Sequence, residues 1–148
     1  MIHLGTAGYH YDDWVGPVYP ANLPRSQWLS HYAQRFNLVE INSSFYHPPS
    51  AAMVAGWSRR VPSDFRFVLK AWRGLTHGEP PPNEPFASFA TALEPLRERE
   101  QLLGVLVQYP TAIKLEKANV RRLRQLREQW PDLPLIVEFR HVSWADPR

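Results

Sequence analysis

Short apolar runs alternate with amphipathic segments along most of this chain. Strand-forming residues are concentrated at residues 2–8, 38–42, 65–71, 102–109 and 135–140. The segments between them repeat apolar residues at helical spacing, as Val120, Leu123 and Leu126 do. No hairpin signal joins two consecutive runs. Strands that alternate with helices predict a parallel sheet with helices on its faces, and therefore an α/β fold.

The helix boundaries are predicted from polar residues that can cap a first turn. Ser26 precedes one helical pattern and Asn119 another, and both side chains can accept a backbone N–H. A short helix is predicted to carry Met53, Val54 and Trp57 on one side. A further helix is predicted between residues 86 and 96. Residues 74–85 are too rich in proline for a regular element, so we expect a long loop there, of a kind that is often functional.

Polar side chains interrupt the apolar strands near their carboxyl ends. Glu138 and Arg140 are two positions apart, so in a strand they point to the same face. Glu40 and Asn42 repeat this spacing in the second strand, and Lys70 ends the third. A charged pair inside an apolar strand costs several kcal/mol unless it is paired or hydrogen-bonded. Buried strands that become polar at their carboxyl ends are typical of the active face of an α/β barrel.

The alternation of each strand predicts which side chains share a face. Val39 and Ile41, like Val137 and Phe139, should face helices. The interior of the barrel should then receive Glu40, Asn42, Ile136, Glu138 and Arg140. The fold class predicted is thus a TIM-type (β/α) barrel, truncated to about five parallel strands with flanking helices.

The length of the chain does not suit a complete barrel. Five strands are predicted in 148 residues, whereas an eight-stranded barrel needs about 200 residues or more. We therefore interpret residues 1–148 as a single partial-barrel domain that corresponds to the first five-eighths of a barrel. The first and last strands would be open edges, which predicts self-association. A truncated product without independent activity is one of the functional hypotheses.

The amino-acid composition excludes some classes of protein but does not select a single function. The net charge of +3 permits anionic ligands such as phosphates or nucleic acid but does not demand them. No apolar run approaches the about 20 residues of a membrane span, and the first residues do not resemble a signal peptide, so we expect a cytoplasmic protein without a membrane partner. The absence of cysteine excludes disulfides, thiolate metal sites and cysteine nucleophiles.

Several sequence blocks resemble the DUF72 (YecE-like) family in the expected order. They are residues 5–20 (GTAGYHYDDWVGPVYP), 32–36 (YAQRF), 39–46 (VEINSSFY), 67–70 (FVLK) with 76–77 (TH), 103–110 (LGVLVQYP) and 137–144 (VEFRHVSW). The resemblance covers nearly the whole chain and implies a TIM-type barrel, but no defined activity. Ala7 and Tyr9 depart from it, since serine and tryptophan are common there in the family.

The polar strand ends suggest an enzyme that binds an anionic, sugar-like or nucleotide ligand at the mouth of the barrel. Glu40 and Glu138 are the acid/base candidates, and Lys70 and Arg140 would stabilise negative charge. The residues that would orient the ligand are Asn42, Tyr46, His77, Gln108 and Trp144. The alternative is a structural polar core, in which Glu40, Lys70, Glu138 and Arg140 form one closed salt-bridge network.

Other chemistries have weaker support in the sequence. His10, His47, His77 and His141 fall in or beside loops at the same end, but they lack tight metal-ligand spacing, so no metal site is predicted and any cofactor stays unknown. Tyr9, Tyr11 and Phe45 are among the aromatic residues of these loops, where they could stack on a base or sugar, or simply seal the mouth. A basic stretch that includes Arg121, Arg122 and Arg124 suggests nucleic-acid binding as the second hypothesis, although a solvated outer helix face explains it better.

Overall fold

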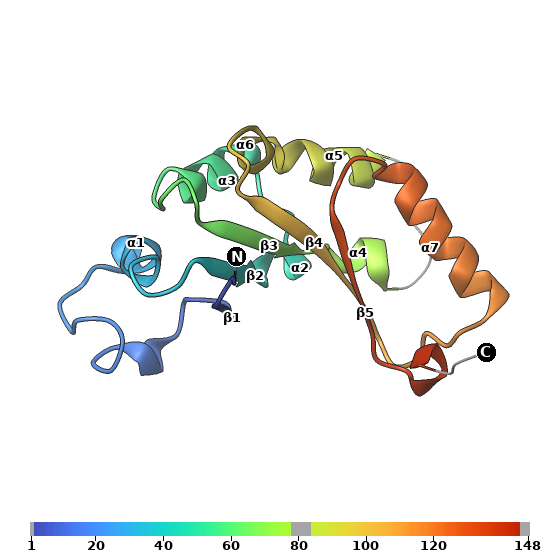
Figure 1. The fold of residues 1–148 in the computed structure, drawn as a ribbon, viewed down its shortest axis with the longest axis horizontal. Helices are drawn as coiled ribbons and strands as arrows, with labels where there is room; N and C mark the ends of the chain where they lie inside the picture. Colours follow the sequence, from blue (N-terminus) through green and yellow to red (C-terminus); the bar gives the residue numbers. More distant parts are fainter. Residues whose placement is uncertain (1, 78–83, 146–148) are drawn as a thin grey trace.

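The computed structural model describes residues 2–77 and 84–145. Within these residues, five strands form one sheet in the order β1-β2-β3-β4-β5, and every neighbouring pair is parallel. The strands are β1 (Gly5–Ala7), β2 (Leu38–Ile41), β3 (Arg66–Lys70), β4 (Leu102–Tyr109) and β5 (Leu135–Phe139). Figure 1 shows the strands fanning across the molecule in sequence order. The predicted α/β fold with a parallel sheet is confirmed; β4 has the predicted bounds, and the other strands are shorter than predicted by one to three residues at one or both ends.

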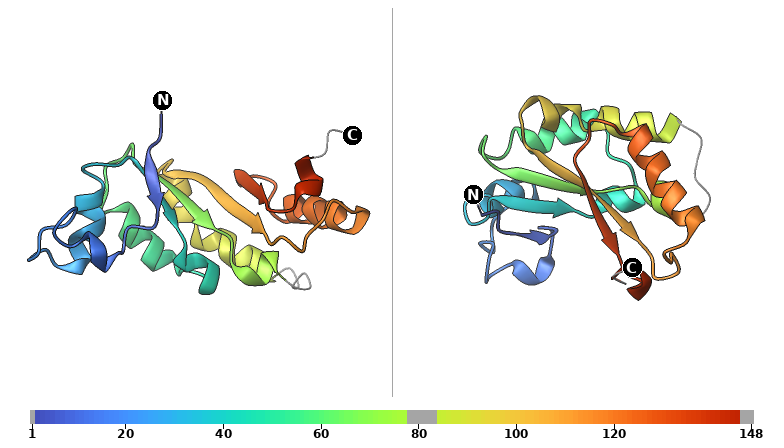
Figure 2. Two further views of the ribbon diagram at one scale, coloured as in Figure 1. Left: turned by 90° about the horizontal axis from the view of Figure 1, so that it is seen from below. Right: turned by 45° about the vertical axis from the view of Figure 1, so that its right-hand side comes forward.

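Helices follow the strands along the chain, as the alternating pattern predicted. They are α1 (Trp28–Tyr32), α2 (Ser43–Tyr46), α3 (Ala51–Ser58), α4 (Arg73–Thr76), α5 (Glu84–Ala92), α6 (Glu94–Glu98) and α7 (Lys117–Gln129), with short 3₁₀ turns at η1 (Asp12–Trp14), η2 (Arg25–Gln27) and η3 (Val142–Ala145). Figure 2 (left) shows α3, α5 and α6 on one side of the sheet, while the described part of the chain places no helix on the other. The sheet therefore has one covered and one open face.

The strand register separates the apolar side chains from the polar ones. Val39 pairs with Phe67, and both are fully buried against the helix layer. Glu40 pairs with Val68 and Gln108 with Glu138, so the polar strand ends lie on the open face. The predicted division of β2 and β5 into helix-facing and inward positions is confirmed by this register. Val137 faces the helix side but is 39% exposed, because β5 lies at the edge of the sheet.

Two predicted helix caps are wrong. Ser26 lies inside the η2 turn, and α1 begins after Gln27 without a side-chain cap. Asn119 lies inside the first turn of α7, where its amide donates to the carbonyl of Lys114, 2.8 Å away. Ser50 instead caps α3, since its hydroxyl accepts the N–H of Met53 at 3.2 Å. A capping residue type permits a helix start but does not fix its position.

The predicted loops also contain short helices. α2 occupies the segment after β2, and α4 together with the start of α5 occupies both ends of the predicted loop at 74–85. The middle of that loop, residues 78–83, lies outside the described residues. Met53 was predicted to pack beside Val54 and Trp57, but it is 52% exposed. One turn of helix satisfies backbone groups locally and leaves little trace in hydrophobic periodicity.

A buried polar link joins the helix layer to β4 at the amino end of the sheet. The Ser58 hydroxyl donates to Oε1 of Gln101 at 2.6 Å, and the Gln101 amide donates to the carbonyl of Pro62 at 2.9 Å. Both side chains are buried, so each hydrogen bond prevents an unsatisfied polar atom in the core. This link fixes the amino end of the sheet and leaves the carboxyl end free for chemistry.

Candidate functional site at the carboxyl ends of the strands

The last two strands present a hydrogen-bonded trio on the open face. The Gln108 amide donates to Oε1 of Glu138 at 2.7 Å, and Nε of Arg140 donates to the same oxygen at 3.0 Å. The trio forms because Gln108 and Glu138 are register partners and Arg140 follows in the same phase. The second carboxylate oxygen of Glu138 has no hydrogen bond among those found for the described residues. It is therefore available to a ligand.

The central strands contribute a second group around an aromatic ring. Nζ of Lys70 lies 4.8 Å from the centre of the Phe45 ring, in a cation–π arrangement. The His77 imidazole meets the same ring edge-on, with centroids 5.2 Å apart. Phe45 comes from α2, directly after β2, and His77 directly follows α4, after β3. The short helices that the sequence did not reveal thus place Phe45 between Lys70 and His77.

The closed four-residue salt-bridge network is not formed. Within the set, and among the described residues, the ion pair is Glu138 with Arg140, whose side chains are half exposed. Lys70 is directed at Phe45, although it is near enough to Glu40 to influence its ionisation. A structural polar core without a closed network stays the alternative to a functional pocket.

The two glutamates ionise differently. Burial raises the pKa of Glu40, with the Glu138 carboxylate acting in the same direction and Lys70 and Asn42 opposing. The hydrogen bonds from Arg140 and Gln108 lower the pKa of Glu138. Two carboxyl groups with pKa values moved in opposite directions form the arrangement that divides acid and base roles in many enzymes.

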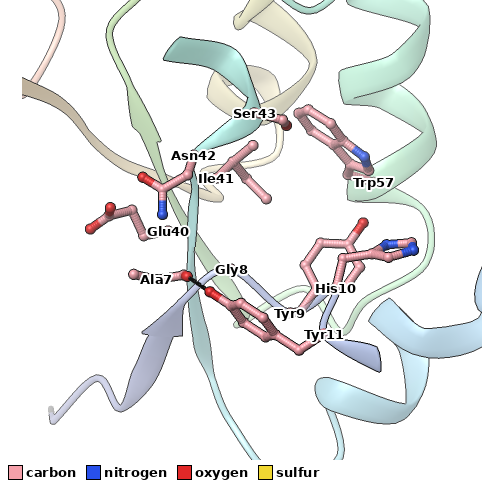
Figure 3. A pocket seen from close by; sticks show the side chains of 10 residues that line it. All are labelled: Ala7, Gly8, Tyr9, His10, Tyr11, Glu40, Ile41, Asn42, Ser43 and Trp57. Atoms are coloured by element: carbon pink, nitrogen blue, oxygen red, sulfur yellow. Dashed lines mark hydrogen bonds between the residues drawn. The ribbon is translucent and has the colours of Figure 1, made fainter. Parts of the chain in front are cut away.

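A pocket of about 310 Å³ adjoins Glu40. Figure 3 shows that Glu40 and Asn42 lie on one side of it, while Tyr9, His10 and Trp57 lie on the other. Tyr11 closes the lower rim by donating its hydroxyl to the carbonyl of Ala7. Aromatic walls beside a carboxyl and an amide suit a ring that carries hydroxyl groups.

Trp144 and Tyr46, two of the predicted ligand-binding residues, contact neighbouring aromatic side chains. Trp144 stacks on Phe139 with the ring centroids 3.9 Å apart, and its indole N–H donates to the carbonyl of Ile113 at 2.8 Å. These contacts hold the segment after β4 against the end of β5. The Tyr46 side chain is 61% exposed and touches Phe45 edge-on. The role of each in ligand binding stays a prediction, as does that of Asn42, Gln108 and His77.

Sequence reasoning missed Tyr109 and Arg122. Tyr109 ends β4, and the guanidinium carbon of Arg122 lies 5.7 Å from the centre of its ring. Arg122 was assigned to a solvated helix face, but α7 starts on the side where β4 ends, and two of its guanidinium nitrogens are buried. Burial lowers the pKa of His77, and Arg122, Lys70, Arg73 and Arg140 lower it further. The position of Tyr109 at a strand end was the available signal.

Clusters of metal-ligating side chains and membrane-spanning helices were both looked for in the described part of the chain. No group of three or more histidine, aspartate or glutamate side chains in residues 2–77 and 84–145 is placed to hold a metal ion. No helix in those residues is both long and apolar enough to cross a bilayer.

A parallel sheet with helices on one face and polar strand ends on the other defines an α/β barrel-type fold with a candidate site at its mouth. The family model described as "Protein of unknown function DUF72" matches residues 3–148, and the chain belongs to this family. Its relatives include UPF0759 protein YunF of Bacillus subtilis, 33% identical over 99% of this chain and 53% of YunF. UPF0759 protein YecE of Escherichia coli K12 is 30% identical over 52% of this chain and 26% of YecE.

Solved structures of family members have the same fold. A DUF72 protein of Enterococcus faecalis superposes with a TM-score of 0.87 at 31% identity, over 99% of this chain and 54% of that one. One from Thermotoga maritima superposes with a TM-score of 0.84 at 37% identity, over 99% of this chain and 58% of that one. The chain thus spans about half the length of these relatives. The resemblance to DUF72 and the TIM-barrel-like fold are both confirmed.

Proposed function

We propose that this chain supplies the acid and base groups of an enzyme site that binds an anionic or sugar-like ligand. These groups would add a proton to the ligand or remove one from it. The observation that carries the proposal is the contrast between Glu40 in β2 and Glu138 in β5, which lie on the same open face of the sheet. Glu40 is half-buried and burial raises its pKa, whereas hydrogen bonds from Arg140 and Gln108 lower the pKa of Glu138. Glu40 would act as the general acid, and Glu138 would accept a proton or stabilise developing positive charge.

The surroundings of the two carboxyl groups support an anionic, hydroxyl-bearing ligand. Lys70 has no ion-pair partner among the described residues and lies on the same open face as Glu40. A free ammonium beside a reacting ligand can stabilise negative charge that develops during proton transfer. The pocket beyond Glu40 has tyrosine and tryptophan rings, which bind sugar rings through their faces.

Solvent-deuterium exchange tests the proposal. The chain is incubated in D₂O with a panel of aldose and ketose phosphates, and loss of the C–H signal beside the carbonyl is followed by ¹H NMR. E40Q and E138Q should each reduce exchange by about 10²-fold or more, because each removes a proton-transfer group. E128Q, on the exposed face of α7, is the matched control and should retain the wild-type rate. Absence of exchange with every member of the panel, or wild-type rates in E40Q and E138Q, contradicts the proposal.

A second candidate function, nucleic-acid binding, is favoured by one surface feature. Lys117, Arg121 and Arg124 line a hollow of about 450 Å³ beside the start of α7, together with Leu115, Val120 and one acidic residue, Glu116. A row of exposed cations one helical turn apart fits a phosphate backbone. If it binds nucleic acid, affinity for single-stranded DNA should fall steeply with salt, and R121M should flatten that slope. An affinity that R121M and R124M leave unchanged contradicts this candidate.

A further inference from the structure

One edge of the Arg122 guanidinium is buried and unpaired among the described residues. Its Nε and Nη2 atoms are both buried, and neither has a hydrogen-bond partner among residues 2–77 and 84–145. These two nitrogens form the side of the guanidinium that donates two parallel N–H bonds to an oxyanion. Two buried guanidinium N–H groups without an acceptor are unfavourable, so this edge of the half-buried Arg122 suits a negatively charged group.

Tyr109 provides a third free donor in the same place. Its side chain is 1% exposed, and its hydroxyl has no hydrogen-bond partner in the described part of the chain. The ring lies beside Arg122, with 5.7 Å between the guanidinium carbon and the ring centre. Buried tyrosine hydroxyls are normally hydrogen-bonded, so two independent side chains have unmet donors side by side.

The surroundings have an excess of positive charge. Lys70, Arg73, Arg122 and Arg140 all act electrostatically on His77, which follows α4. Figure 1 and Figure 2 (right) place α4 beside α7, which carries Arg122. Of these cations, Arg140 is neutralised by Glu138, whereas the ion pairs found among the described residues do not include Lys70, Arg73 or Arg122. A dianion balances this excess better than a single carboxylate.

We propose that Arg122 and Tyr109 form a phosphate subsite at the carboxyl end of β4, which takes the phosphate group of a monoester ligand. The fork of Arg122 would hold two phosphate oxygens, and the Tyr109 hydroxyl would donate to one of them. The subsite deepens the proposed function by naming the anion, and it rests on that function only for the rest of the ligand. It uses no atom of Glu40 or Glu138, so the two proposals fail separately.

Thermal unfolding with inorganic phosphate as the probe tests the subsite. Phosphate should raise the midpoint of the wild-type chain in a concentration-dependent manner. R122M should weaken phosphate binding by about 10-fold or more, because it removes two charge-assisted hydrogen bonds. Y109F removes one neutral donor and should weaken binding by about 2- to 10-fold. R59M alters an exposed arginine at the end of α3, away from both proposed sites, and should bind phosphate like the wild type.

The stability of the variants without phosphate separates a ligand site from an internal ion pair. If the edge of Arg122 is vacant in the free protein, R122M removes two buried, unpaired N–H groups and should unfold at the same or a higher temperature than the wild type. Ribose 5-phosphate should then stabilise the wild type, while ribose should not, which distinguishes a monoester from its sugar.

Two results would overturn the subsite. One is phosphate affinity that R122M and Y109F leave at the wild-type value. The other is an unfolding temperature that R122M lowers by several degrees while the wild type shows no response to phosphate. That pattern would identify a carboxylate of the chain itself as the partner of Arg122.

Discussion

Nε of Arg140 lies 3.0 Å from Oε1 of Glu138, two positions earlier in the chain. The two side chains meet because alternate residues of an extended segment project to the same face. The contact orients the carboxylate and keeps it ionised, so it connects the alternation of β5 to the chemistry of the site.

Removal of Arg140 should change the titration of Glu138. In the wild type, hydrogen bonds from Arg140 and Gln108 lower the pKa of Glu138. R140M should raise that pKa toward its ordinary range, measured by NMR titration of the glutamate side-chain carboxyl carbons. R97M breaks the exposed pair of Arg97 with Glu94 and is the control, because it should leave the pKa of Glu138 unchanged.

The same pair makes a prediction about stability and pH. Since the folded state lowers the pKa of Glu138, its contribution to stability is present above the unfolded-state pKa and is lost as pH falls through the folded-state pKa. R140M should therefore lose less stability than the wild type over that acid range. Identical slopes of unfolding free energy against pH for the two proteins would contradict this prediction.

Glu40 should behave in the opposite sense. Burial raises its pKa, so its contribution favours folding below the unfolded-state pKa and is lost as pH rises through the folded-state pKa. E40Q resembles the protonated form and should be more stable than the wild type at pH 7, with the difference disappearing in acid. Urea denaturation at several pH values measures this, and a destabilised E40Q at pH 7 would be the contrary result.

Gly5 should not tolerate a side chain. A Cβ there would lie 2.0 Å from the carbonyl oxygen of Leu38, the residue it pairs with across β1 and β2. G5A should reduce the free energy of unfolding by about 2 kcal/mol or more, because backbone must move. G56A is the control: its nearest neighbour is the end of the Arg60 side chain at 3.4 Å, and alanine in a helix favours stability by about 1 kcal/mol.

The 148-residue chain should self-associate in solution. β1 and β5 are the edges of the sheet, and Ile136 on the open face is 41% exposed. Unpaired strands and exposed apolar side chains favour contact with a second copy. Light scattering after size exclusion should show oligomers, and I136K should reduce them. A cooperatively unfolding, monodisperse wild-type monomer would be incompatible with this expectation.

Which side chains share a face followed from local rules. Glu40, Lys70, Gln108 and Glu138 could be assigned to one side of the sheet because strand alternation is a property of consecutive residues. The family resemblance was equally available, since its blocks are continuous in sequence. The capping predictions failed at Ser26 and Asn119, where several neighbouring residues could begin a helix.

Contacts between elements required the folded structure. The Lys70 ammonium contacts the Phe45 ring instead of forming a salt bridge, because α2 places that ring over the end of β3. Arg122 turns inward because α7 begins beside the end of β4. Strand alternation and helical periodicity depend on residues close together in the sequence. The sequence alone therefore predicted the parallel strands and the polar face of the sheet. Partner choice depends on distances between elements far apart in sequence, and packing determines those distances.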